Sequence, residues 1–71
     1  MKIETKNLIV EMFGSTSEYR RREAALKLLK MRHNSCVRNA LMIKISDVHD
    51  IYVRDAIMNK LRHSVRHSVE K

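Results

Sequence analysis

The sequence predicts a small all-α protein of about four helices. The composition suits helix, because the chain has no proline, one glycine and no tryptophan, and many Leu, Met, Ala, Lys, Arg and Glu residues. Apolar residues recur three and four positions apart, as on one face of a helix, and capping residues separate these stretches. With 71 residues the chain forms one domain over 1–71, whose core is thin, because a chain of this size buries only about 60% of its unfolded surface.

The first helix is expected from about Glu4 to Phe13. One of its faces carries the apolar residues Leu8, Ile9, Met12 and Phe13. Gly14 follows directly and is typical of a residue that ends a helix.

The second helix is expected from about Glu18 to His33. The segment "STSE" at 15–18 offers a capping box, in which Ser15 accepts a hydrogen bond from the first turn while Glu18 reaches back, with Ser17 as the alternative cap. The broad apolar face contains Ala24, Ala25, Leu28, Leu29 and Met31. The opposite face contains Arg20, Glu23, Lys27 and Lys30.

The third and fourth helices are expected over about Cys36–Ile45 and Ile51–Val69. Asn34 suits a left-handed exit from the preceding helix and Ser35 an N-cap, so the connection resembles a tight helical hairpin. The third helix buries Val37, Ala40, Leu41 and Ile45. The segment "SDVHD" at 46–50 holds three possible caps for the fourth helix. One side of that helix carries Val53, Ile57, Leu61, Val65 and either Ser68 or Val69.

Two segments resemble each other and a known repeat. A shift of 32 residues places Arg22 on Arg54, Ala24 on Ala56 and Leu29 on Leu61. The segment "ISDVHDIYVRDAIMNKL" at 45–61 resembles the junction between two HEAT-type repeats, in which an aspartate-bearing turn leads into Val-Arg, a small residue and Leu. The earlier "SEYRRREAALKLL" at 17–29 is similar, except that Arg21 stands where the pattern prefers valine.

The resemblance covers about residues 3–65 and implies a short HEAT-like stack of helical pairs; a plain small helical bundle is the alternative. It implies a structural charge pair between Arg54 and either Asp47 or Asp50. Proteins of this family usually provide binding surfaces, for proteins more often than for nucleic acids, and catalysis is unusual among them.

The charge of the chain favours polyanionic partners. Fifteen Lys and Arg residues stand against eight Asp and Glu residues, which gives a net charge of +7 and a pI near 10.1. The alternative is that the basic residues only keep a small domain soluble. Further cations at Arg32, Arg38 and Lys60 join the surface only where the packing of the helices aligns them.

The basic run "YRRRE" at 19–23 marks a candidate phosphate-binding site. The dipole of the second helix disfavours cations in its first turns, so a phosphate backbone would explain three arginines there; a solvated helix surface is the alternative. The predicted phosphate contacts are Arg20, Arg21, Arg22, Lys27, Lys30, Arg62 and Arg66. Because only Tyr19 and Tyr52 are available for base stacking, we expect contacts to the backbone and a weak sequence preference.

The segment "RHSVRHSV" at 62–69 repeats a four-residue unit, which stacks like residues along a helix. His63 and His67 have a spacing that can share a zinc ion, but the sequence fixes no third ligand, and Cys36, His33 or His49 would have to approach. We therefore expect no metal and no cofactor, and interpret the histidines as an exposed titratable stripe.

These observations favour a non-catalytic basic module that binds RNA or DNA. The alternative is a small adaptor or inhibitor that docks onto a larger acidic protein; a homodimer is a further possibility. No nucleophile with its base, carboxylate pair or complete ligand set can be assembled, so we expect neither an enzyme nor a small-molecule substrate.

We expect a cytoplasmic protein that does not enter the membrane. The single Cys36 cannot form an internal disulfide, which fits a reducing compartment. Apolar runs such as "LIV" at 8–10 are much shorter than a membrane span, and the N-terminal residues do not resemble a signal peptide.

Overall fold

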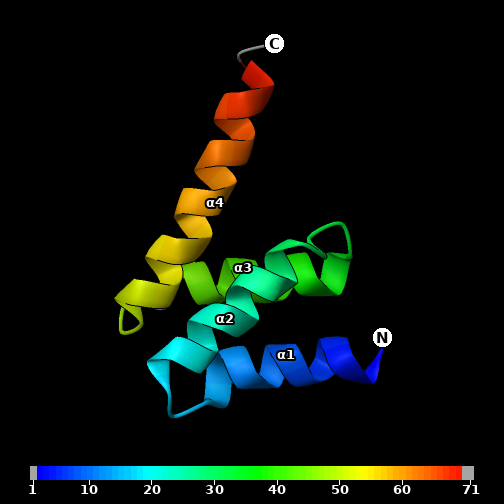
Figure 1. The fold of residues 1–71 in the computed structure, drawn as a ribbon, viewed down its shortest axis with the longest axis vertical. Helices are drawn as coiled ribbons and strands as arrows, with labels where there is room; N and C mark the ends of the chain where they lie inside the picture. The colour runs from blue at the N-terminus through cyan, green and yellow to red at the C-terminus, as the bar shows by residue number, and fades with distance from the viewer. Residues whose placement is uncertain (1, 70–71) are drawn as a thin grey trace.

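Residues 2–69, the part of the chain whose backbone the structure describes, fold into four helices. The structure is a computed structural model that describes the backbone of residues 2–69 and the side chains of residues 2–62. The helices are α1 (Ile3–Gly14), α2 (Glu18–Leu29), α3 (Ser35–Ile45) and α4 (Ile51–Val69), and residues 2–69 contain no strand (Figure 1). The predicted all-α class is confirmed.

Helix α2 lies at the centre of the arrangement and contacts α1, α3 and α4. The chain reverses its direction between α1 and α2 and again between α2 and α3, so that α1 and α3 run the same way (Figure 1). Helix α4 packs against α2 and α3 over its first half, and its C-terminal half extends beyond the other three helices (Figure 1). The HEAT-like repeat stays a prediction.

Side chains cap the starts of α2, α3 and α4, the last through Asp50. Ser17 is the N-cap of α2 and accepts a hydrogen bond from the Arg20 amide at 3.3 Å, whereas the Ser15 hydroxyl accepts from the Ser17 amide at 3.2 Å. Ser17, the alternative cap in "STSE", is therefore the residue that caps α2, and Ser15 is not. Asn34 caps α3 by accepting from the amides of Cys36 and Val37 at 2.9 and 3.4 Å.

The structure differs from the sequence-based expectation at two helix ends. Asn34 has an extended backbone with φ of −73°, so the expected left-handed exit there and the cap at Ser35 are wrong. Helix α2 ends at Leu29, and residues 30–33 form turns, in which the amides of Lys30, Met31 and Arg32 donate to carbonyl oxygens three residues back rather than four. Gly14 is the last residue of α1, and its φ is not positive.

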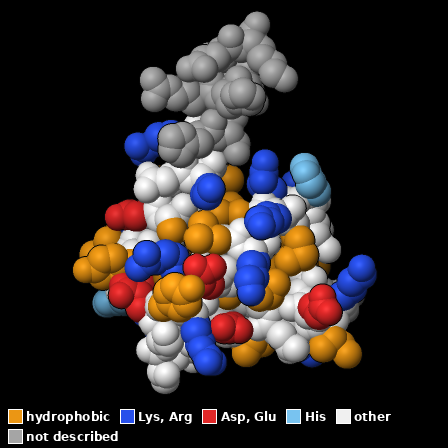
Figure 2. Space-filling view, viewed as in Figure 1, with side chains coloured by type: hydrophobic (Ala, Val, Ile, Leu, Met, Phe, Trp, Pro, Cys, Tyr) orange, Lys and Arg blue, Asp and Glu red, His pale blue; other side chains and the backbone are white. Residues whose placement is uncertain are grey.

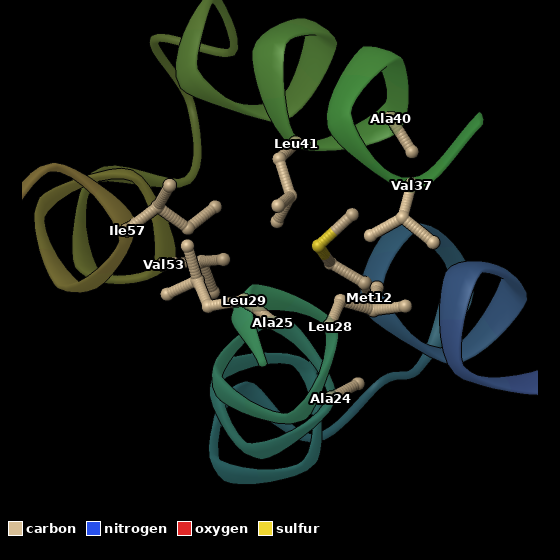
Figure 3. Packing of buried hydrophobic residues seen from close by; sticks show 10 residues of the cluster. All are labelled: Met12, Ala24, Ala25, Leu28, Leu29, Val37, Ala40, Leu41, Val53 and Ile57. Atoms are coloured by element: carbon tan, nitrogen blue, oxygen red, sulfur yellow. The ribbon is translucent and has the colours of Figure 1, made fainter. Parts of the chain in front are cut away.

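The core is formed by the predicted apolar faces, which meet between the four helices (Figure 3). Its buried members are Met12, Ala24, Ala25, Leu28, Leu29, Val37, Ala40, Leu41, Val53 and Ile57. Five of them, Met12, Leu28, Val37, Val53 and Ile57, are fully buried, and each contributes about 1.5–3 kcal/mol.

Some members of the predicted faces lie at the edge of the core or outside it. Partly buried residues that pack against the core are Leu8, Ile9, Met31, Ile45 and Leu61. Phe13, expected on the buried face of α1, is 41% exposed. The side chains of Val65, Ser68 and Val69 lie outside the described residues.

Candidate nucleic-acid interface

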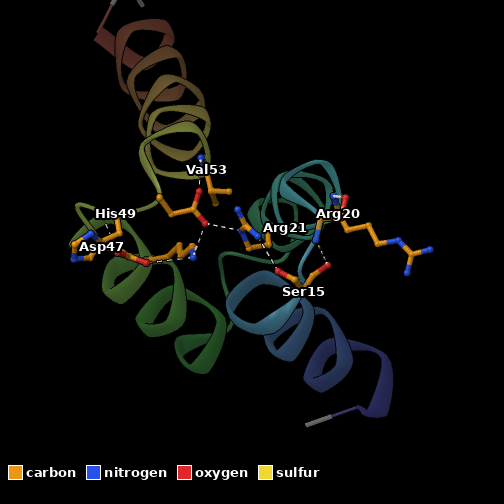
Figure 4. A network of polar contacts seen from close by, with 9 residues as sticks. Ser15, Arg20, Arg21, Asp47, His49 and Val53 are labelled. Atoms are coloured by element: carbon orange, nitrogen blue, oxygen red, sulfur yellow. Dashed lines mark hydrogen bonds and ion pairs between the residues drawn. The ribbon is translucent and has the colours of Figure 1, made fainter.

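A cluster of buried charges joins three parts of the chain. Asp50 directly precedes α4, and its Oδ2 accepts hydrogen-bonded ion pairs from Arg21 Nε and Lys44 Nζ, both at 2.8 Å (Figure 4). Its Oδ1 accepts from the Val53 amide at 3.4 Å, as the side chain of an N-cap does. The side chains of Lys44 and Asp50 are only 3% and 8% exposed, so this ion pair is largely removed from water, whereas Arg21 is 23% exposed.

The two cations of this cluster have further partners. Arg21 Nη1 donates to the carbonyl oxygen of Ser15 at 2.8 Å, which links the end of α1 to the start of α2. Lys44 Nζ lies 3.4 Å from Asp47 Oδ2 and 5.4 Å from the centre of the Phe13 ring. Phe13 is partly exposed, but its ring packs over the buried ammonium group of Lys44 and so contributes to this cluster.

The electrostatics of the cluster keep its carboxylates ionised. Burial by itself raises the pKa of Asp50, but the hydrogen bonds from Lys44 and Arg21 outweigh this effect and lower the pKa below its ordinary value of 3.8. The pKa of Asp47 is lowered mainly by the hydrogen bond that its carboxylate accepts from the His49 amide at 3.0 Å.

Arg21, a predicted phosphate contact, is thus committed to the interior. It lies four and seven residues before Ala25 and Leu28, so it belongs to the buried face of α2. The charge pair implied for Arg54 is wrong, since Asp50 pairs with Arg21 and Lys44 while Arg54 Nε lies 3.7 Å from Asp55 Oδ1. Arg21 and Lys44 take the place of Arg54 beside Asp50.

The other predicted contacts on α2 point to solvent. Arg20 and Arg22, near the start of the helix, and Lys27 and Lys30, at its end, are all exposed. Arg62 on α4 is exposed as well, and the side chain of Arg66 lies outside the described residues. The four exposed contacts on α2 are therefore divided between its two ends. Of these two ends, only the one with Lys27 and Lys30 lines a groove.

A groove of about 450 Å³ lies between the end of α2 and the middle of α4, and we call it the α2–α4 groove. Its lining consists of Glu23, Leu26, Lys27, Leu29, Lys30, Arg32, Lys60 and Leu61. Leu26 and Leu61 form most of the apolar part of this surface, over Leu29, which is only 4% exposed. Four cations surround it, with Glu23 as the one acid among these eight residues. Figure 2 shows this face, on which Lys and Arg side chains flank exposed hydrophobic side chains.

Arg32 connects this groove to a second one. Its Nη1 donates to the Leu29 carbonyl at 2.8 Å, which ties the guanidinium group to the end of α2. The second groove, of about 310 Å³, lies between α3 and α4 and is lined by Arg32, His33, Arg38, Leu41, Met42 and Leu61. Arg32 and Leu61 belong to both grooves, so the basic surface continues from one to the other.

The structure brings together residues that the sequence did not group. Lys27 and Lys30 were predicted as contacts, whereas Arg32, Arg38 and Lys60 were recognised only as further positive charge. The available signal was that Lys60 directly precedes Leu61 on the apolar side of α4. This signal is not sufficient by itself, because Lys60 reaches the groove only through the tertiary packing of α4 beside the end of α2.

Two other features bear on the function. Among the residues whose side chains are described, no three His, Cys, Asp or Glu residues lie close enough together to hold a metal ion, and His63 and His67 fall outside that set. Within the described part of the chain, no helix combines the length and the apolar character that crossing a membrane requires.

The chain was compared with known protein families, with curated proteins and with solved structures, and none of them matches it.

Proposed function

We propose that the protein is a non-catalytic helical module that binds nucleic acid through a basic surface centred on the α2–α4 groove. The observation that supports this proposal is the gathering of Lys27, Lys30, Arg32 and Lys60 around one groove, whose described lining contains a single acid, Glu23. Cations spaced along a groove suit a phosphate backbone, because each phosphate they neutralise releases condensed counterions. The net charge of +7 adds attraction at long range.

The proposed contact set differs from the one expected from sequence. Lys27, Lys30 and the exposed Arg62 stay in it, and Arg32, Arg38 and Lys60 join it. Arg20 and Arg22 lie at the other end of α2 and line neither groove. Arg21 leaves the set because its Nε and Nη1 already donate to Asp50 and to the Ser15 carbonyl. The contact by Arg66 stays a prediction.

The test is a titration of a fluorescent oligonucleotide, followed by anisotropy, over a series of salt concentrations. Affinity is expected to fall steeply with salt for every sequence tried. The double variant Lys27→Ala/Lys30→Ala removes two contacts, so the slope of log K against log salt is expected to flatten by about 1.4 for a single strand and about 1.8 for a duplex.

The matched control is Arg20→Ala/Arg22→Ala, which removes the same charge from the start of α2. It is expected to weaken binding less than the lysine pair, because neither arginine lines the groove. A larger loss in the arginine variant would move the interface to the start of α2. Absence of binding at low salt would reject the proposal altogether.

A second candidate function is binding to a larger acidic protein. It is favoured by two exposed apolar side chains on α3: Met42, which lines the second groove and is 58% exposed, and Ile43, which is 63% exposed. Native mass spectrometry and the absorbance ratio of the purified chain, before and after nuclease treatment, separate the two candidates. A stoichiometric protein that survives nuclease favours this second function, and loss of all bound material favours the first.

A further inference from the structure

We infer that the α2–α4 groove takes single-stranded nucleic acid, with an unpaired base against its leucines and the flanking phosphates on its cations. This inference rests on the proposed function and adds to it the class of nucleic acid. Its starting point is the division of the groove into an apolar part, Leu26, Leu29 and Leu61, and a cationic part, Lys27, Lys30, Arg32 and Lys60.

An unpaired nucleotide matches this division of the groove. A base has apolar faces that gain from leaving water, and the phosphates on either side of it carry negative charge. In a duplex the bases are stacked inside, so a duplex offers phosphates to the lysines but leaves the leucines without an apolar partner. The apolar part of the groove therefore discriminates between the two forms.

Arg32 suits the position of a stacking residue beside the leucines. Guanidinium planes are common stacking partners for unpaired bases, and Arg32 is already held in place by its hydrogen bond to the Leu29 carbonyl at 2.8 Å. A strand that leaves the first groove past Arg32 and Leu61 enters the second, where Arg38 provides the next cation and Met42 further apolar surface.

The same geometry suits an acidic amphipathic helix less well. Such a helix binds through apolar anchors at i, i+3 or i+4, and i+7, which requires an apolar strip about two turns, or roughly 11 Å, long. Among the residues whose side chains are described, the groove offers Leu26 and Leu29, one turn apart on α2, and Leu61 on α4. That surface accommodates one flat group rather than a row of anchors.

The experiment compares three probes of equal phosphate number: a single strand, the same strand with abasic sites throughout, and a duplex. Binding by the full chain is measured by anisotropy at one fixed salt concentration. The abasic strand keeps the charges and removes the bases, and we expect it to bind about five- to tenfold more weakly than the normal strand, the lower end of the range known for base stacking.

The Leu26→Gln variant tests whether the groove is the site of this difference. Leu26 is partly buried against the core, so the variant is expected to keep the far-UV circular dichroism of the wild type but to melt at a lower temperature, and binding is measured well below that temperature. It should lose about five- to tenfold in affinity for the normal strand and nothing for the abasic strand. The matched control is Ile43→Gln, an equally polar change at a 63% exposed site that lines neither groove.

The outcomes separate the inference from the proposed function. Equal binding of normal and abasic strands would overturn the inference and leave the proposed function in place, and this comparison decides even if Leu26→Gln does not fold. Failure of all three probes at low salt would overturn both. Binding of an acidic amphipathic helical peptide in their place would assign the groove to a protein.

Discussion

Replacing Asp50 with Asn tests whether the buried charge cluster holds the helices together. The substitution removes one negative charge and keeps the size of the side chain, including an oxygen that can accept from the Val53 amide. Arg21 and Lys44 then lose the carboxylate that both of them contact at 2.8 Å. Since Lys44 is 3% exposed, water cannot replace this partner without a local opening of the structure.

The expected loss of stability in Asp50→Asn depends on the partners that Arg21 and Lys44 keep. Removing one partner of a buried ion pair typically costs about 3–5 kcal/mol. Lys44 keeps Asp47 at 3.4 Å, and Arg21 keeps the Ser15 carbonyl and is 23% exposed, so we expect a lower value, about 2–3 kcal/mol. A chain of 71 residues has a free energy of unfolding of about 3.5–11 kcal/mol, so the loss is a large share of it.

The effect should depend on pH in a defined direction. The pKa of Asp50 is lower in the folded chain than its ordinary value of 3.8, so its carboxylate stabilises the fold above that value and this contribution is lost as the pH falls through the lowered pKa. Asparagine does not titrate. The difference between wild type and Asp50→Asn should therefore stay constant near neutral pH and shrink in acid. Asp47 titrates in both proteins, so it largely cancels from the comparison.

The assay is urea unfolding followed by far-UV circular dichroism, over a series of pH values. The control is Asp55→Asn, which removes the same charge from a side chain that is 57% exposed and should cost no more than about 0.5 kcal/mol. If the two variants unfold at the same urea concentration at neutral pH, the cluster does not stabilise the fold. A gap that persists unchanged into acid would refute the account of the Asp50 pKa.

Three further predictions concern stability and use the same unfolding assay. Ile57→Ala empties a fully buried site and should cost about 2–5 kcal/mol, whereas Ile43→Ala, at a 63% exposed site, should change stability by less than about 0.5 kcal/mol; similar values would contradict the assignment of the core. Asn34→Ala removes the cap of α3 and should cost about 1 kcal/mol, and no loss would mean that the cap bonds contribute nothing. Gly14→Ala should stabilise by about 0.4–1 kcal/mol, since Gly14 is helical without a positive φ and an added Cβ meets nothing within 4 Å; destabilisation would show that this residue needs a glycine backbone.

The helices and most of the core could be predicted from local patterns. Met12, Leu28 and Val53 follow helical spacing, and a cap residue precedes α2 and α3, so these features depend only on near neighbours. The position of the cap within "STSE" and the geometry at Asn34 could not be chosen in advance, because each segment offers competing acceptors within two residues.

The buried charges and the groove depend on contacts between distant segments. Lys44 lies in register with Val37 and Leu41, which was a signal of burial, but a lysine is rarely buried unless an anion is supplied from elsewhere. That anion is Asp50, which in turn lies 29 residues from Arg21 in the chain. In the same way, Lys60 joins Lys27 at the groove only through the packing of α4 on α2.

Because Asp50 holds the start of α4, a small rotation of the helix at that end becomes a larger displacement further along its axis. The carboxylate fixes the first turn of α4, and Lys60 at the groove follows ten residues later, about 15 Å along the helix axis. A rotation of only 10° about that fixed end displaces Lys60 by about 2.6 Å on an arm of this length. The charge cluster therefore helps to position this wall of the groove, together with Ile57 and Leu61, which pack the same part of α4 against the core.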